Sequence, residues 1–126
     1  MPITPVADPA GEAKREIQNL PPQQVSEEPA GGKAVLLDIR EPEELALHGI
    51  IEGSVHAPRG MMEYYADPST PYYRQEFKPG NRIILQCASG GRSALAASSL
   101  WKMGYENIAH LDGGIKAWKE AGLPVK

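Results

Sequence analysis

Three short apolar runs, each followed by a segment of helical character, constrain the fold of this 126-residue chain most strongly. Continuous apolar runs of this length are typical of strands that are buried on both faces. Strands that alternate with helices predict an α/β fold, with a mostly parallel sheet flanked by helices on both faces. A shorter strand and a shorter helix complete the pattern. The predicted strands are 34–38, 53–57, 82–87 and 107–111, and the predicted helices are 41–48, 60–66, 92–103 and 115–121.

The first thirty residues differ in composition from the rest of the chain. They contain six of the twelve prolines and little apolar material, so we expect an arm rather than a core element. Within the arm, Ala13, Ile17 and Leu20 recur at helical spacing, which predicts a short helix laid on the body. We therefore expect an N-terminal arm with a short helix over 1–20 and one folded domain over 21–126.

The only cysteine, Cys87, lies at the end of the third predicted strand. Ligands of α/β proteins bind beyond the carboxyl ends of the strands. Backbone N–H groups of the following turn, and the positive end of the next helix, can point at the sulfur and favour its thiolate form. Gly90 and Gly91 permit the positive φ angles of such a turn. A lone cysteine is often only a small buried hydrophobe, but the glycines, Arg92 and Ser93 at these offsets favour a reactive thiol.

Composition excludes several classes of function. A single cysteine cannot form an intramolecular disulfide, and it leaves a peroxidase or disulfide reductase without a resolving thiol. The net charge of −3, with acidic and basic residues interspersed, predicts neither a nucleic-acid partner nor a membrane partner. No apolar run is long enough to span a bilayer, and the N-terminus lacks the order of a secretory signal. We expect a cytoplasmic protein with no cofactor and no bound metal.

Three motifs in succession resemble the signatures of single-domain rhodaneses, a family of sulfurtransferases. The resemblance covers about residues 20–126 and implies a rhodanese-like three-layer α/β sandwich. It also implies a thiosulfate sulfurtransferase, which moves a sulfane sulfur from a donor such as thiosulfate to a thiophilic acceptor, cyanide or a thiol, through a persulfide on Cys87. The motifs are Asp38-Ile39-Arg40-Glu41-Pro42-Glu43-Glu44, the segment from Cys87 to Ser93, and Leu111-Asp112-Gly113-Gly114 with Ala117-Trp118.

The loop length favours sulfur over phosphorus. Cys87 and Arg92 have the spacing C-x4-R, whereas related phosphatases and arsenate reductases use C-x5-R, whose larger ring of N–H donors encloses a tetrahedral oxyanion. Loop N–H groups would stabilise the negative terminal sulfur, Arg92 would attract the anionic donor, and Ser93 would donate a hydrogen bond or, more economically, cap the helix. The residues expected to bind substrate are Ala88, Ser89, Gly90, Gly91, Arg92 and Ser93.

A second set of residues is expected to support the loop. Asp38, at a strand end, could bind loop N–H groups, while Arg40 and Glu44 could pair and hold the first predicted helix against the sheet. Arg59 also lies at a predicted strand end and is a candidate second cation at the mouth of the site. The three histidines, His48, His56 and His110, are expected to be structural or solvent-facing.

Several alternatives stay open at this point. A non-catalytic binding or regulatory module of the same fold would not need the cysteine, and a carrier could pass its persulfide to a protein acceptor. A phosphatase or arsenate reductase is disfavoured by the short loop. Five aromatic residues gather in one segment, where they could cover the entrance of the site or form a subunit contact. They are Tyr64, Tyr65, Tyr72, Tyr73 and Phe77.

Overall fold

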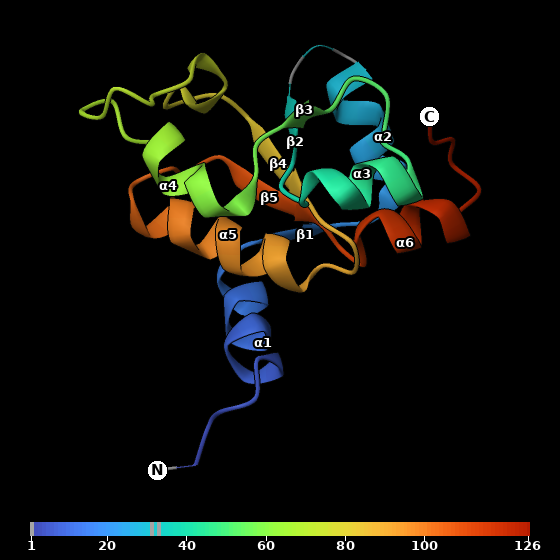
Figure 1. Ribbon diagram of the computed structural model, residues 1–126, viewed down its shortest axis with the longest axis horizontal. Coiled ribbons are helices and arrows are strands. Elements are labelled where there is room, and N and C mark those ends of the chain that lie inside the picture. The colour runs from blue at the N-terminus through green and yellow to red at the C-terminus, as the bar shows by residue number, and fades with distance from the viewer. Residues whose placement is uncertain (1, 31, 33) are drawn as a thin grey trace.

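The computed structural model describes residues 2–30, 32 and 34–126 (Figure 1). Met1, Gly31 and Lys33, which belong to the predicted arm and domain, lie outside the described residues. The elements are, in chain order, α1 (Ala7–Glu16), β1 (Gln18–Leu20), α2 (Pro22–Ala30), β2 (Val35–Asp38), α3 (Pro42–His48), β3 (Val55–His56), the 3-10 helix η1 (Arg59–Met61), α4 (Met62–Tyr65), the 3-10 helix η2 (Gln75–Phe77), β4 (Ile83–Gln86), α5 (Gly91–Lys102), β5 (Ile108–Leu111) and α6 (Gly114–Glu120).

The five strands form one sheet in the order β1-β5-β4-β2-β3, and every pair is parallel. The predicted α/β fold is confirmed, with a sheet that is entirely rather than mostly parallel. Each predicted strand is present. The three apolar runs form β2, β4 and β5 and are largely buried on both faces, as expected, whereas the predicted strand 53–57 forms only the two-residue, half-buried β3. Asp38 pairs with Gln86 in register, so the carboxyl ends of β2 and β4 lie side by side.

Helices cover both faces of the sheet, which makes the three layers that the resemblance implied. One core lies on the side of α4 and α5 and includes Met62 and Leu100; the other lies on the side of α2 and α6 and includes Val25 and Trp118. Helix α1 packs against α5 rather than against the sheet (Figure 1). In the described part of the chain, no helix is both long and apolar enough to cross a membrane.

The N-terminal region differs from the prediction. The helix expected to reach Leu20 ends at Glu16, and Gln18–Leu20 forms β1, an edge strand parallel to β5. The two prolines after Leu20 favour an extended backbone before them, and pairing with β5 satisfies the backbone groups of that segment. Helix α2 was not predicted, because Val25, which is fully buried, is its one strongly apolar residue.

The aromatic segment is partly a core element. Phe77 is fully buried, and Tyr65 and Tyr73 pack against the same core. The Tyr105 hydroxyl lies 2.6 Å from the carbonyl oxygens of both Ala66 and Phe77, which ties the segment to α5 and β5. Tyr64 and Tyr72 are about half exposed and meet edge to face, with ring centroids 6.3 Å apart. The entrance cover and the subunit contact stay predictions, and these two exposed rings are the ones available for either.

Candidate active site

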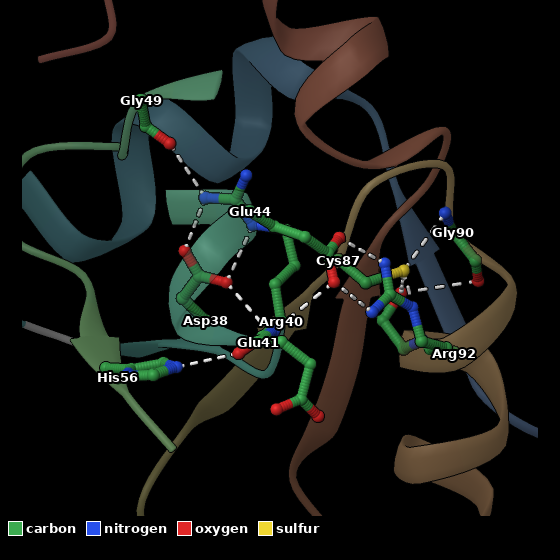
Figure 2. Close-up of polar contacts among 10 residues, drawn as sticks. Asp38, Arg40, Glu41, Glu44, Gly49, His56, Cys87, Gly90 and Arg92 are labelled. Carbon is green, nitrogen blue, oxygen red and sulfur yellow. Dashed lines mark hydrogen bonds and ion pairs between the residues drawn. The ribbon is translucent and has the colours of Figure 1, made fainter. Parts of the chain in front are cut away.

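Cys87 follows β4 directly, and its sulfur faces into the loop that leads to α5 (Figure 2). The Gly90 and Ser93 backbone N–H groups donate to Sγ over 3.2 and 3.3 Å. Gly90 has a φ of 102°, in the left-handed region, which turns its N–H inward. Cys87 is only 1% exposed. A sulfur held by two amides at a helix start is arranged to carry negative charge.

The start of α5 corrects two details of the prediction. The helix begins at Gly91, one residue before the predicted start at Arg92, and its N-cap residue Gly90 makes no side-chain cap. The expectation that Ser93 caps the helix is therefore wrong. Its hydroxyl oxygen instead lies inside the loop, 2.8 Å from Nδ1 of His110, 3.3 Å from the Gly90 carbonyl oxygen and 3.5 Å from Sγ of Cys87.

The start of α6 holds the loop from the other side. The N–H groups of Ile115 and Lys116 donate to the carbonyl oxygens of Cys87 and Ala88 over 2.9 and 3.1 Å. This approach requires a glycine at position 114, where φ is +64° and a Cβ atom would lie 2.5 Å from Ala88 C and O and 2.6 Å from Cys87 O. The glycine pair of the third motif thus shapes the cysteine loop.

We expect Gly114→Ala to lower the free energy of unfolding by about 2–4 kcal/mol, because left-handed strain adds to overlap with backbone that cannot move freely. Gly122→Ala is the matched control, since φ there is +79° but no atom lies within 4 Å of its Cβ position; the strain alone costs about 1–2 kcal/mol. Urea denaturation measures both. Equal losses for the two variants would contradict the close approach at Gly114.

Arg92 and Glu44 join α5 to α3 through a bidentate ion pair (Figure 2). Both N–O distances are 2.7 Å. The hydrogen bonds from Arg92 lower the pKa of Glu44 to about 2 against desolvation, and the same bonds raise the pKa of Arg92. The predicted pairing of Arg40 with Glu44 is therefore wrong. The first motif and the cysteine loop are joined through Glu44 and Arg92.

This ion pair should make stability depend on pH in acid. A carboxyl group whose pKa falls from 4.5 to about 2 on folding stabilises fully above pH 4.5, and this stabilisation is lost as the pH falls toward 2. At pH 7 we expect Glu44→Gln to lower the free energy of unfolding by about 1–2 kcal/mol, because solvent screens a pair whose arginine is 40% exposed. The difference from wild type should vanish near pH 2. Glu43→Gln, on an exposed position of the same helix, should change little at any pH, and a deficit for Glu44→Gln that persists at pH 2 would contradict the electrostatic origin.

Asp38 and Arg40 form a buried ion pair at the end of β2 (Figure 2). Asp38 is 1% and Arg40 0% exposed. Arg40 donates from Nε and Nη2 to the two carboxylate oxygens over 3.0 and 2.7 Å, and from Nη2 to the Gly49 carbonyl over 2.8 Å. Asp38 also accepts the Arg40 backbone N–H over 3.1 Å; this amide belongs to the turn into α3, and none of the described hydrogen bonds of Asp38 is with the cysteine loop. Both residues fix the turn from β2 into α3.

The remaining predicted residues lie at different places. Arg59 pairs with Glu63 over 2.9 Å, and Glu63 also accepts a hydrogen bond from Ser99; among the described contacts of Arg59, none is with the cysteine loop. Ala88 and Ser89 line a cavity of about 380 Å³ between α3 and α6, together with Arg40, His48, Ile115, Lys116, Lys119 and Glu120. Gly91 opens α5 and leaves the side of the loop open, with no atom near its Cβ position.

His110 reaches the site although the sequence did not point to it. It is fully buried on β5 and contacts Ser93 through Nδ1 and Asn19 through Nε2, over 2.8 and 2.7 Å. Burial lowers the pKa of His110 to about 4. The sequence feature that could have indicated this role is the position of His110, a polar residue, within the apolar run that forms the strand beside β4.

Comparison with known proteins finds a matching family and several similar chains. The family model of the rhodanese-like domain matches residues 21–121. Thiosulfate sulfurtransferase GlpE of Ectopseudomonas mendocina is 33% identical over 107 residues, which cover 82% of this chain and 86% of that protein. Thiosulfate sulfurtransferase 16, chloroplastic, of Arabidopsis thaliana is 34% identical over 94 residues, which cover 71% of this chain and 78% of that protein.

A solved structure resembles the whole chain. It is a protein from Rhodopseudomonas palustris, described as of unknown function and a possible tyrosine phosphatase, and it is 36% identical with a TM-score of 0.91. The match covers 100% of this chain and 99% of that one. With its family match over most of the chain, its all-parallel sheet and its single cysteine in the loop after β4, the chain belongs to the rhodanese-like family.

Proposed function

We propose that this protein is a thiosulfate sulfurtransferase that carries sulfur as a Cys87 persulfide. The observation that carries the proposal is the placement of the only thiol of the chain between two inward-pointing amides at the start of α5. The relatives named as thiosulfate sulfurtransferases support the same reaction. A cradle of six residues, from Cys87 to Arg92, suits a single sulfur atom better than a phosphate group.

The reaction takes two displacements at sulfur. In the first, the Cys87 thiolate attacks the outer sulfur of thiosulfate, the S–S bond of the donor breaks, and sulfite leaves with the bonding electron pair. In the second, cyanide or a thiolate attacks the terminal sulfur, and Cys87 leaves as a thiolate. The Gly90 and Ser93 amides donate to Cys87 Sγ, and they stabilise the negative charge of the thiolate that attacks in the first step and leaves in the second. Ping-pong kinetics follow from the covalent intermediate.

We propose that the positive charge of Arg92 attracts the anionic donor. Two of its nitrogens are held by Glu44, which orients the guanidinium while part of its surface stays exposed. A planar cation held in this way suits a sulfonate-like anion. Arg59 as a second cation would have to exchange its partner Glu63 for the donor. The proposed acceptor is a small thiol or a protein thiol, and a cytoplasmic location stays a prediction.

The test is to incubate the purified protein with thiosulfate, remove excess donor and record its intact mass. The proposal expects a gain of one sulfur atom, which cyanide then removes as thiocyanate. A parallel assay with an aryl phosphate addresses the phosphatase alternative that the Rhodopseudomonas protein raises. Phosphate release without sulfur uptake would overturn the proposal, and absence of both activities would favour the non-catalytic module.

A further inference from the structure

A continuous line of hydrogen bonds runs from the nucleophile to the edge of the sheet. Cys87 Sγ lies 3.5 Å from Ser93 Oγ, Ser93 Oγ lies 2.8 Å from His110 Nδ1, and His110 Nε2 lies 2.7 Å from Asn19 Oδ1. Cys87, Ser93 and His110 are buried. Asn19 belongs to β1, just before the residues that the family model matches. The line therefore joins the N-terminal segment to the cysteine loop.

The direction of this line is set at its outer end. The Asn19 side-chain amide donates from Nδ2 to the carbonyl oxygens of Lys14 and Ile17 over 2.8 and 3.2 Å. Carbonyl oxygens only accept, so the amide cannot be flipped, and its Oδ1 must face His110 as an acceptor. His110 must then carry its proton on Nε2. A neutral imidazole has one N–H group, which leaves Nδ1 as a bare acceptor.

The orientation passes from His110 to Ser93. The Ser93 hydroxyl has one hydrogen, and the Nδ1 acceptor at 2.8 Å takes it in preference to the Gly90 carbonyl oxygen at 3.3 Å. What Ser93 Oγ then presents to the sulfur is a lone pair. A lone pair accepts from a thiol S–H group but repels a thiolate.

We propose that His110 is a positioning residue that turns the Ser93 hydroxyl, so that it accepts a hydrogen bond from the Cys87 thiol and cannot donate one to the thiolate. The inference rests on the proposed function only in taking Cys87 as the nucleophile. His110 thereby opposes the two backbone amides and sets which fraction of Cys87 is ionised at a given pH. The N-terminal segment takes part, because Asn19 anchors the tautomer.

Other charged groups lie near this line of hydrogen bonds. Arg92, from α5, faces Cys87, and Glu44 from α3 and Glu41 lie around that guanidinium. Asp112, at the end of β5, and Lys14, from α1, act on His110 in opposite directions. These groups are unchanged in the variants used below, so their fields cancel in the comparison.

The first test reads the tautomer in the unaltered protein. Two-bond ¹H–¹⁵N correlation spectra should show His110 as the neutral Nε2–H tautomer at pH 7. A Nδ1–H tautomer or an imidazolium at that pH would overturn the proposal without any variant having to fold.

The second test measures the thiolate itself. The ultraviolet absorbance of the thiolate is followed against pH, with Cys87→Ser as the blank. In His110→Leu the freed Ser93 hydroxyl can donate to the thiolate, and we expect the midpoint to fall by about one pH unit, the effect of one charge-assisted hydrogen bond. In a Ser93→Ala background the same substitution should leave the midpoint unchanged, because His110 acts only through Ser93.

The outcomes separate the two proposals. An unchanged midpoint in His110→Leu, or a shift that persists without the Ser93 hydroxyl, would overturn the role of His110. Neither measurement uses a sulfur donor. Failure to load sulfur from thiosulfate would therefore count against the proposed function alone.

Discussion

Cys87→Ser is expected to take up no sulfur from thiosulfate, a fall in loading rate of at least about a thousandfold. The substitution replaces one atom and keeps an acceptor between the Gly90 and Ser93 amides, whose distances to the sulfur are 3.2 and 3.3 Å. A hydroxyl in that position stays protonated at neutral pH and is a poor nucleophile toward sulfur. Intact mass after exposure to thiosulfate measures the result.

Two controls make this result interpretable. Thermal unfolding should show that Cys87→Ser is as stable as wild type, since the loop contacts are kept. Wild-type protein whose thiol has been alkylated should also gain no sulfur, because the chain has no second cysteine. Sulfur uptake by Cys87→Ser would mean that another group is the acceptor, and the proposed mechanism would then fail.

The cysteine loop could be predicted because its information is local. The apolar run before Cys87, the glycines after it and the small-residue helix that follows specify β4, the turn and α5 within twenty consecutive residues. The carboxyl ends of β2 and β4 meet because parallel pairing aligns Asp38 with Gln86. That placement follows from the fold class alone.

The N-terminal segment could not be read in the same way. The spacing of Ala13, Ile17 and Leu20 fits a helix, yet Leu20 is buried because β1 pairs with β5, some ninety residues away in sequence. Helical spacing over so few residues does not distinguish one longer helix from a helix followed by a short strand. The contact of Asn19 with His110 depends on the same distant pairing.

Partner choice among charged residues was also beyond local reasoning. Arg40 and Glu44 are four residues apart, a spacing at which helical side chains meet. However, Arg40 precedes α3 and lies at a buried strand end, where Asp38 is the carboxylate within reach. Glu44 is left to face α5, and its partner Arg92 is 48 residues further along the chain.

The largest loss of stability is expected for Asp38→Ala, about 3–5 kcal/mol in the free energy of unfolding at pH 7. Removal of the carboxylate leaves the Arg40 guanidinium buried. Among the described residues, the backbone carbonyl of Gly49 is then the one hydrogen-bond partner left to the guanidinium. The cost is that of an uncompensated buried charge, not of one lost contact. Urea denaturation measures it, and Glu76→Ala is the matched control, because it breaks the partly exposed pair Arg74–Glu76, with an N–O distance of 2.9 Å, for less than about 1 kcal/mol.

A second substitution at the same site separates charge from packing. If the buried charge is the cause, Asp38→Ala combined with Arg40→Leu should recover part of the loss, because the guanidinium is then gone. A double variant no more stable than Asp38→Ala, or a single variant no worse than Glu76→Ala, would contradict this account. Since Asp38 and Arg40 fix the turn into α3, and α3 carries the Glu44 that holds Arg92, Asp38→Ala should also slow sulfur loading at temperatures where the variant is still folded.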